Sequence, residues 1–116
     1  MQYRLKNYEQ ALQNFEEASR LDDENVEARK NTGFLLALLG RTHNAILVYR
    51  EALALAPHDS ALLRRLASLS FTVNDNDAGI AYARQAYDAM PSSGRPDFDA
   101  FIQSLQLQPP ISRNKN

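Results

Sequence analysis

Apolar residues recur along most of this chain every three or four positions, the spacing that places side chains on one face of an α-helix. The clearest stretch runs from Ala28 to Leu39 and includes Phe34, Leu35 and Leu38. The apolar positions of the next two stretches are Ala45, Ile46, Tyr49, Ala52 and Leu53, and then Leu62, Leu63, Leu66, Leu69 and Val73. Two further helices are predicted over residues 8–21 and 80–90. No stretch alternates apolar and polar residues as a strand does, so the pattern predicts an all-α protein.

Residues that favour turns separate these helices. Gly40 can take the positive φ that ends a helix. Pro57 lacks an amide hydrogen and disfavours helix at the residue before it, so a helix is expected to end there. Asp59 or Ser60 can cap the next helix, and residues 74–77, with the sequence NDND, are expected to form the next turn.

The pattern repeats with a fixed period. Ala52 lies five residues before Pro57, and Ala86 lies five residues before Pro91. Ala18 lies as far before Ala52 as Ala86 lies after it. A fixed period of about 34 residues indicates helical units that stack on one another in an array.

A two-helix unit of this length resembles the tetratricopeptide repeat. The middle unit, residues 26–59, matches the family's pattern at Gly33, Ala45, Tyr49, Ala52 and Pro57, and has Leu36 at the place often taken by tyrosine. It departs from the pattern at Arg29, where the family often has tryptophan, and at Thr32, where leucine is frequent. The third unit, residues 60–93, keeps Leu63, Leu66, Ala67, Ala86 and Pro91. Gly79 and Ala83 stand where alanine and a large aromatic residue are usual, so thinner packing is expected there.

The resemblance implies a right-handed superhelical stack of about two and a half units over residues 1–107. The first unit, residues 1–25, is partial because it lacks nearly all of its first helix. Residues 96–107 are expected to form a capping helix over the last unit. Residues 108–116 contain two prolines and mostly polar residues, so a disordered tail is expected.

Composition narrows the classes of function. Hydrophobic residues make up 44% and charged residues 23%, and the formal net charge is −1, without the basic excess of nucleic-acid binders. The absence of cysteine excludes disulfides, thiolate metal sites and cysteine nucleophiles. Neither a signal peptide nor a membrane-spanning segment is expected. The compartment is left open, with a cytoplasmic location favoured.

No catalytic, cofactor-binding or metal site is expected. His43 and His58 would lie about 22 Å apart along one helix, too far to share a metal or a proton. The acidic segment 21–27 lacks the spacing and glycine of a calcium loop and is expected to form a turn. Residues 35–39, LLALL, match a short leucine motif with which some helices dock into nuclear receptors, but these leucines are expected in the core. We therefore predict a protein that is not an enzyme.

The resemblance implies a concave groove lined by the first helix of each unit. The residues it places there include Lys30, Asn31, Phe34, Leu38, Arg64, Arg65, Ser68 and Phe71. Cationic and aromatic side chains together suit an acidic or carboxylate-ended peptide with an apolar anchor. The alternative is that Arg64 and Arg65 form a solvated surface paired with nearby carboxylates. Some family members clamp the C-terminal carboxylate of chaperone tails, but only Asn31 and Arg65 match that clamp, so chaperone binding is not predicted.

The sequence favours a scaffold that binds a peptide or helix of a partner protein in this groove. One alternative is self-assembly through the open face of the first predicted helix, at Leu12 and Phe15. Another is an accessory repeat domain of a larger protein. Neither nucleic-acid binding nor membrane insertion is predicted.

Overall fold

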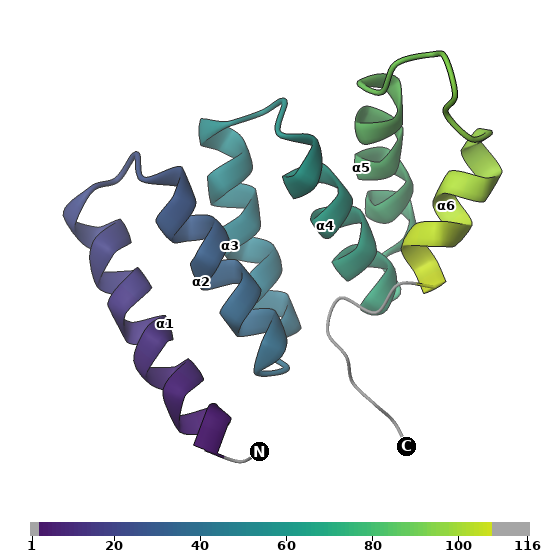
Figure 1. Ribbon diagram of the computed structural model, residues 1–116. Helices are drawn as coiled ribbons and strands as arrows, with labels where there is room; N and C mark the ends of the chain where they lie inside the picture. The colour runs from purple at the N-terminus through teal and green to yellow at the C-terminus, as the bar shows by residue number, and fades with distance from the viewer. Residues whose placement is uncertain (1–2, 108–116) are drawn as a thin grey trace. The chain divides into compact units, whose positions relative to one another are not determined.

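The computed structural model describes the backbone of residues 3–107 and the side chains of residues 7–106 (Figure 1). Over these residues the chain is helical and contains no strand, which confirms the predicted all-α class. The helices are α1 (Tyr3–Leu21), α2 (Val26–Leu38), α3 (Thr42–Leu55), α4 (Ser60–Thr72), α5 (Asn76–Asp88) and α6 (Phe98–Leu107). Helix α1 therefore begins five residues before the predicted start at residue 8. The tail predicted over residues 108–116 lies outside the described residues.

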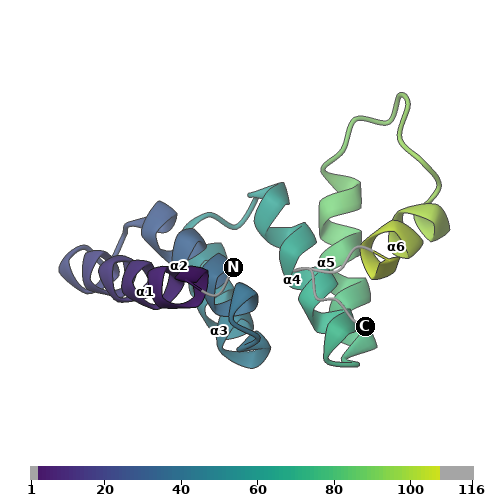
Figure 2. The ribbon, with the colours of Figure 1, turned by 60° about the horizontal axis from the view of Figure 1, so that its bottom comes forward.

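The chain folds into two compact units, Met1–Pro57 and His58–Asn116. The sequence predicted a single repeat domain over residues 1–107. In the first unit, α2 and α3 form an antiparallel hairpin and α1 packs along α2 (Figure 2). In the second unit, α4 and α5 form a hairpin of the same kind, and α6 packs against both helices. Each unit is thus a helical hairpin with one flanking helix.

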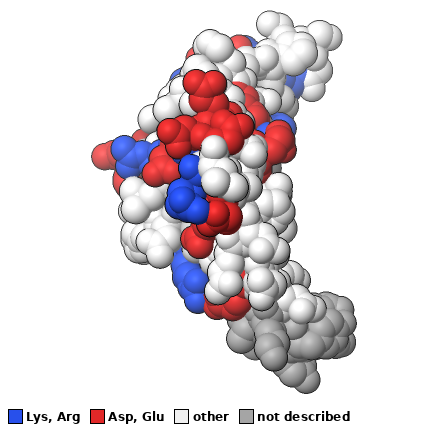
Figure 3. Space-filling view, turned by 90° about the vertical axis from the view of Figure 1, so that its left-hand side faces the viewer, with Lys and Arg blue, Asp and Glu red and all other residues white. Residues whose placement is uncertain are grey.

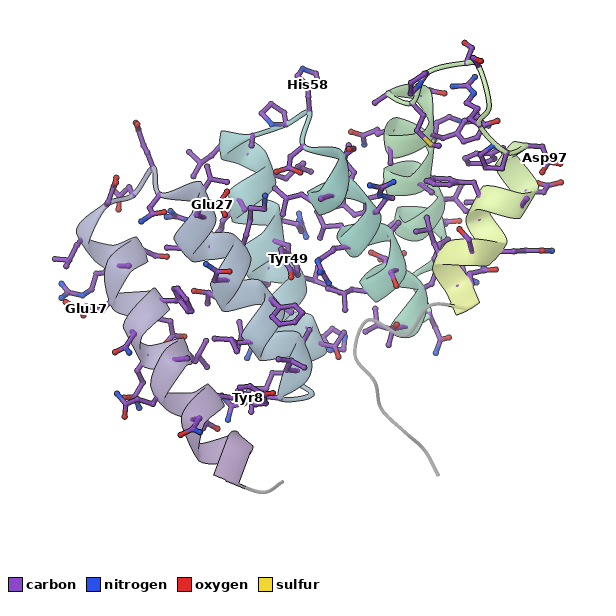
Figure 4. All side chains as sticks on the ribbon, in the orientation of Figure 1. Tyr8, Glu17, Glu27, Tyr49, His58 and Asp97 are labelled. Carbon is purple, nitrogen blue, oxygen red and sulfur yellow. The ribbon has the colours of Figure 1, made fainter. Side chains whose placement is uncertain are left out.

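Tyr49 of α3 fills the centre of the first hairpin (Figure 4). Its side chain is 1% exposed, and a Cβ added to Gly33 of α2 would lie 2.9 Å from its ring. A contact this close leaves no room for any side chain at position 33. Glycine is therefore required there by the approach of the aromatic ring.

The second hairpin has the reverse arrangement. Phe71 of α4 carries the ring, and Gly79 of α5 makes room for it, because a Cβ at Gly79 would lie 2.6 Å from Phe71. Ala83, where the family often has an aromatic residue, is fully buried. The thinner packing expected around Gly79 and Ala83 is therefore wrong, since Phe71 fills that space from the facing helix.

Short polar side chains begin four of the helices. In each case a side-chain oxygen accepts a hydrogen bond from the amide three residues further on, the usual N-cap geometry. The bonds run from Ala28 to Asn25 (2.9 Å), Leu62 to Asp59 (3.2 Å), Ala78 to Asp75 (3.2 Å) and Ala100 to Asp97 (2.8 Å). Helix α3 differs, because Arg41 stands at its N-cap and makes no side-chain cap. Gly40 has the predicted positive φ, 81°, just before it.

Candidate functional site

One side of α2 remains exposed within the first unit. This side is called here the α2 face. It carries Lys30, Phe34 and Leu38, each one turn from the next, and Asn31 beside Lys30. Phe34 is 37% exposed, which is unusual for an aromatic side chain in a folded unit. Asn31 is also exposed, whereas Lys30 and Leu38 are half-buried. The α2 face therefore offers an apolar surface bordered by an amide and an ammonium group.

Most of the other residues of α2 are buried in the first unit. Its buried residues are Ala28, Thr32, Gly33, Leu35, Leu36 and Ala37. The Thr32 hydroxyl donates to the Ala28 carbonyl at 2.8 Å, so this polar group is satisfied inside the unit. Leu35 and Leu36 of the LLALL segment lie in this core, as predicted, whereas Leu38 and Leu39 are half-buried. Phe34 is 37% exposed.

Lys30 of the α2 face has an acidic neighbour. Its ammonium lies 3.7 Å from the Glu27 carboxylate, one turn earlier on the helix. Exposed pairs at this spacing are weak, because water screens both charges.

Helix α4 exposes two adjacent arginines, Arg64 and Arg65, called here the α4 arginine pair. The helix itself contains no aspartate or glutamate. Its other predicted groove residues are placed differently. Ser68 is 7% exposed and donates to the Leu105 carbonyl at 3.3 Å, so α6 covers it. Phe71 packs on Gly79 inside the hairpin, and neither residue lies on an open surface with the arginines.

Leu12, proposed from the sequence as part of a self-association face, is 4% exposed. Helix α1 packs against α2, and Leu12 is buried within the first unit. Phe15 is half-buried on the same helix. The expected open apolar face is therefore largely closed, because the chain covers it with its own second helix.

Two arginines tie the first unit together, and sequence reasoning missed the role of both. The Arg41 guanidinium donates to the Glu9 carboxylate at 2.7 Å and so links the start of α3 to α1. Arg29, which stands where tryptophan is frequent, donates to the Asp23 carbonyl and lies 3.5 Å from the Glu51 carboxylate. Its side chain is only 16% exposed. Arg29 thus takes the place of an aromatic ring between the helices and joins the turn after α1 to α3.

Aromatic contacts hold α6 in the second unit. The Tyr87 ring lies 5.1 Å from the Phe98 ring and 5.5 Å from the Phe101 ring, measured between centroids. Arg84 stacks over Phe98 at 3.7 Å, and Arg95 stacks over Tyr87 at 4.2 Å. The spacing of Phe98 and Phe101 was a usable signal, since residues three apart lie on one side of a helix.

Acidic side chains gather over α1 and the turn after it (Figure 3). The exposed acidic residues there are Glu16, Glu17, Asp22, Asp23 and Glu24. Arg20 pairs with Glu17 on the same helix. The segment 21–27 forms a turn, as predicted, with Asn25 as the cap of α2. This side of the first unit is negative and will disfavour acidic partners.

No group of three or more metal-ligating side chains occurs among the described residues. His43 lies exposed on α3, and His58 is exposed in the turn after α3 (Figure 4). None of the helices described is long and apolar enough to traverse a lipid bilayer.

The two hairpins, with a partial unit before them and one helix after them, match a known family. The family model of the tetratricopeptide repeat matches residues 2–60 and 39–94. The chain belongs to the tetratricopeptide repeat family. It contains about two and a half such repeats followed by a C-terminal helix. No curated protein matches the chain. Tetratricopeptide repeats are typically non-enzymatic scaffolds that mediate protein–protein interaction.

Proposed function

We propose that this tetratricopeptide repeat protein binds segments of partner proteins through the exposed side of α2 in the first unit and, as another surface, through the exposed side of α4 in the second unit. The observation that carries the proposal is Phe34, an aromatic side chain left 37% exposed on a helix whose other large residues are packed. Exposed aromatic residues bordered by polar groups are typical anchors of protein interfaces.

The α4 arginine pair supplies the charge preference of this proposal. Arg64 and Arg65 are adjacent and exposed on α4. Guanidinium groups bind carboxylates through paired hydrogen bonds. A segment that binds the α4 arginine pair therefore carries at least one carboxylate.

Self-assembly through Leu12 and Phe15 is not proposed, because Leu12 is buried against the chain's own helices.

A peptide selection followed by binding measurements tests the proposal. Random peptides are selected on the wild-type chain, and the enriched peptides are measured by fluorescence anisotropy. We expect the enriched peptides that bind the first unit to carry an aromatic or leucine residue. Phe34→Ala should weaken their binding at least tenfold. Leu47→Ala is the matched control, because Leu47 is also an exposed apolar residue, at 56%, but belongs to α3.

Charge reversal tests the arginine pair in the same assay. The double variant Arg64→Glu and Arg65→Glu should weaken acidic peptides at least tenfold. The control, Arg20→Glu with Arg50→Glu, changes the net charge equally at exposed positions of α1 and α3. Equal losses in both double variants would mean that only net charge matters, and the assignment to α4 would fail.

A further inference from the structure

The flanking helix α6 attaches to the second unit through few buried side chains. Among residues 98–106, only Phe101 and Leu105 are buried, at 5% and 4% exposure. They lie four residues apart and therefore on one side of the helix. The remaining side chains of this segment are half-buried or exposed. Helix α6 is thus an amphipathic segment that rests on its neighbours by a single narrow stripe.

The surface under α6 has the character of a receptor for such a helix. Tyr87 of α5 contacts both Phe98 and Phe101 with its ring, and its hydroxyl donates to the Pro96 carbonyl at 2.6 Å. Ser68 of α4 donates to the Leu105 carbonyl at the other end. We call this surface, formed by Ser68, Arg84 and Tyr87, the α4–α5 face.

The connection before α6 is exposed over its first residues, and Arg95 further along it donates to the Tyr87 carbonyl at 3.0 Å. The residues from Pro91 to Gly94 are all exposed, and Gly94 has a φ of 81°. The connection arches beyond the end of α5 before α6 begins (Figures 1 and 2). A helix of ten residues is marginal in water by itself, so α6 is ordered by its docking. Segments that fold as they bind are held less tightly than their contact area suggests.

We propose that the α4–α5 face is a binding site for an amphipathic helix of a partner protein, which α6 occupies in the isolated chain. The partner helix carries phenylalanine and leucine four residues apart, because α6 fills the site with that pair. The site is separate from the α2 face and the α4 arginine pair. An attached helix has a high effective concentration, so a partner succeeds only when α6 is detached or when it binds more tightly.

An exchange experiment on the full chain tests this proposal. A protease site is inserted between the exposed Ser92 and Ser93, and the chain is cut there after folding. A fluorescent peptide of residues 93–107 is then added, and its anisotropy is followed. We expect the peptide to bind the cut chain and replace the original segment. The uncut chain should bind it at least tenfold more weakly.

Two altered peptides sharpen the result. A peptide with Phe101→Ala and Leu105→Ala should bind the cut chain at least tenfold more weakly than the original. A peptide with Gln103→Ala, at an exposed position, should bind within twofold of the original. Peptides that use the α2 face would bind the cut and uncut chains equally, so this result is independent of the proposed function.

Two outcomes would overturn the proposal. The first is a cut chain that does not exchange its segment for the peptide. The second is a loss of circular-dichroism signal after cutting that exceeds the contribution of α6. Either result would make α6 a permanent part of the second unit's core.

Discussion

Both hairpins of this protein pack an aromatic ring against a glycine, but the helix that carries the ring differs between the two hairpins. In the first unit the ring belongs to the second helix, as Tyr49, and the glycine to the first, as Gly33. In the second unit the ring belongs to the first helix, as Phe71, and the glycine to the second, as Gly79. The positions one repeat period away from each of these pairs hold alanine on both helices: Ala67 with Ala83, and Ala37 with Ala45.

The repeat thus preserves the combined content of the two pairs in each hairpin and not the residue at a position. Each hairpin has one aromatic–glycine pair and one alanine–alanine pair in its corresponding positions. Because protein interiors are close-packed, a ring gained on one helix must be matched by lost volume on the facing helix. Four predictions test this comparison.

Removing the rings should give the largest effect and separate the two units. Tyr49→Ala should lower the free energy of unfolding by about 3–5 kcal/mol, because it leaves a cavity at a site that is 1% exposed. Phe71→Ala should cost less, about 2 kcal/mol, because Phe71 is half-buried and water can fill part of the space. Urea unfolding followed by circular dichroism measures both values. A cost for Phe71→Ala equal to that for Tyr49→Ala would contradict the comparison.

The second-largest loss of stability is expected when each glycine is replaced by alanine, which adds a methyl group. Gly33→Ala should destabilise by about 1–3 kcal/mol, because the fully buried Tyr49 ring cannot move away. Gly79→Ala should destabilise less, although the clash is closer, because the half-buried Phe71 ring can turn outward. The double variant Gly79→Ala with Phe71→Ala is the control. It should be no less stable than Phe71→Ala, because alanine favours the helix by about 1 kcal/mol over glycine.

The two units can also be compared by the contacts that attach their flanking helices, α1 and α6. Tyr87→Phe removes the hydroxyl that donates to Pro96 and should cost about 0.5–1.5 kcal/mol. The effect should concentrate in α6 and appear as faster amide hydrogen exchange over residues 98–106. Uniform acceleration across α4, α5 and α6 would show that the hydroxyl supports the whole unit and not the flanking helix alone.

The smallest effect is expected for the ionic attachment of α1. Glu9→Gln weakens the pair with Arg41 and should cost about 0.2–1 kcal/mol, as exposed pairs do. The difference from the wild type should shrink as salt is added, because salt screens exposed charges. The Tyr87→Phe difference should not change with salt. Equal salt responses would remove the distinction between an ionic attachment and a neutral hydrogen-bonded one.

Much of this fold was predictable from the sequence because helix periodicity and turn residues are local signals. The period between Pro57 and Pro91 predicted the units, and Gly40 and Asp59 predicted two helix boundaries. The early start of α1 was missed, since its first residues carry no cap or apolar stripe that separates them from a linker. The exchange of ring and glycine was also missed, because it depends on which side chains face each other across two helices.

The candidate site was predictable only in part. The family resemblance, supported by helical spacing, predicted Lys30, Asn31, Phe34 and Leu38 on one side of α2, and of these Asn31 and Phe34 are exposed. The resemblance also grouped Ser68 and Phe71 with the arginines, but another helix covers Ser68 and Phe71 packs inward. Helix periodicity gives the side of a helix that a residue occupies. It does not give what a later segment places over that side.

The facing pairs also restrict the order in which this sequence can change by single substitutions. From Phe71 with Gly79, a path to alanine at both positions passes more easily through Phe71→Ala. The reverse order first places a methyl group 2.6 Å from the ring. In the first unit the same rule makes Tyr49 the residue that must change before Gly33. Each glycine can therefore be replaced only after the aromatic residue that faces it has been replaced by a smaller one.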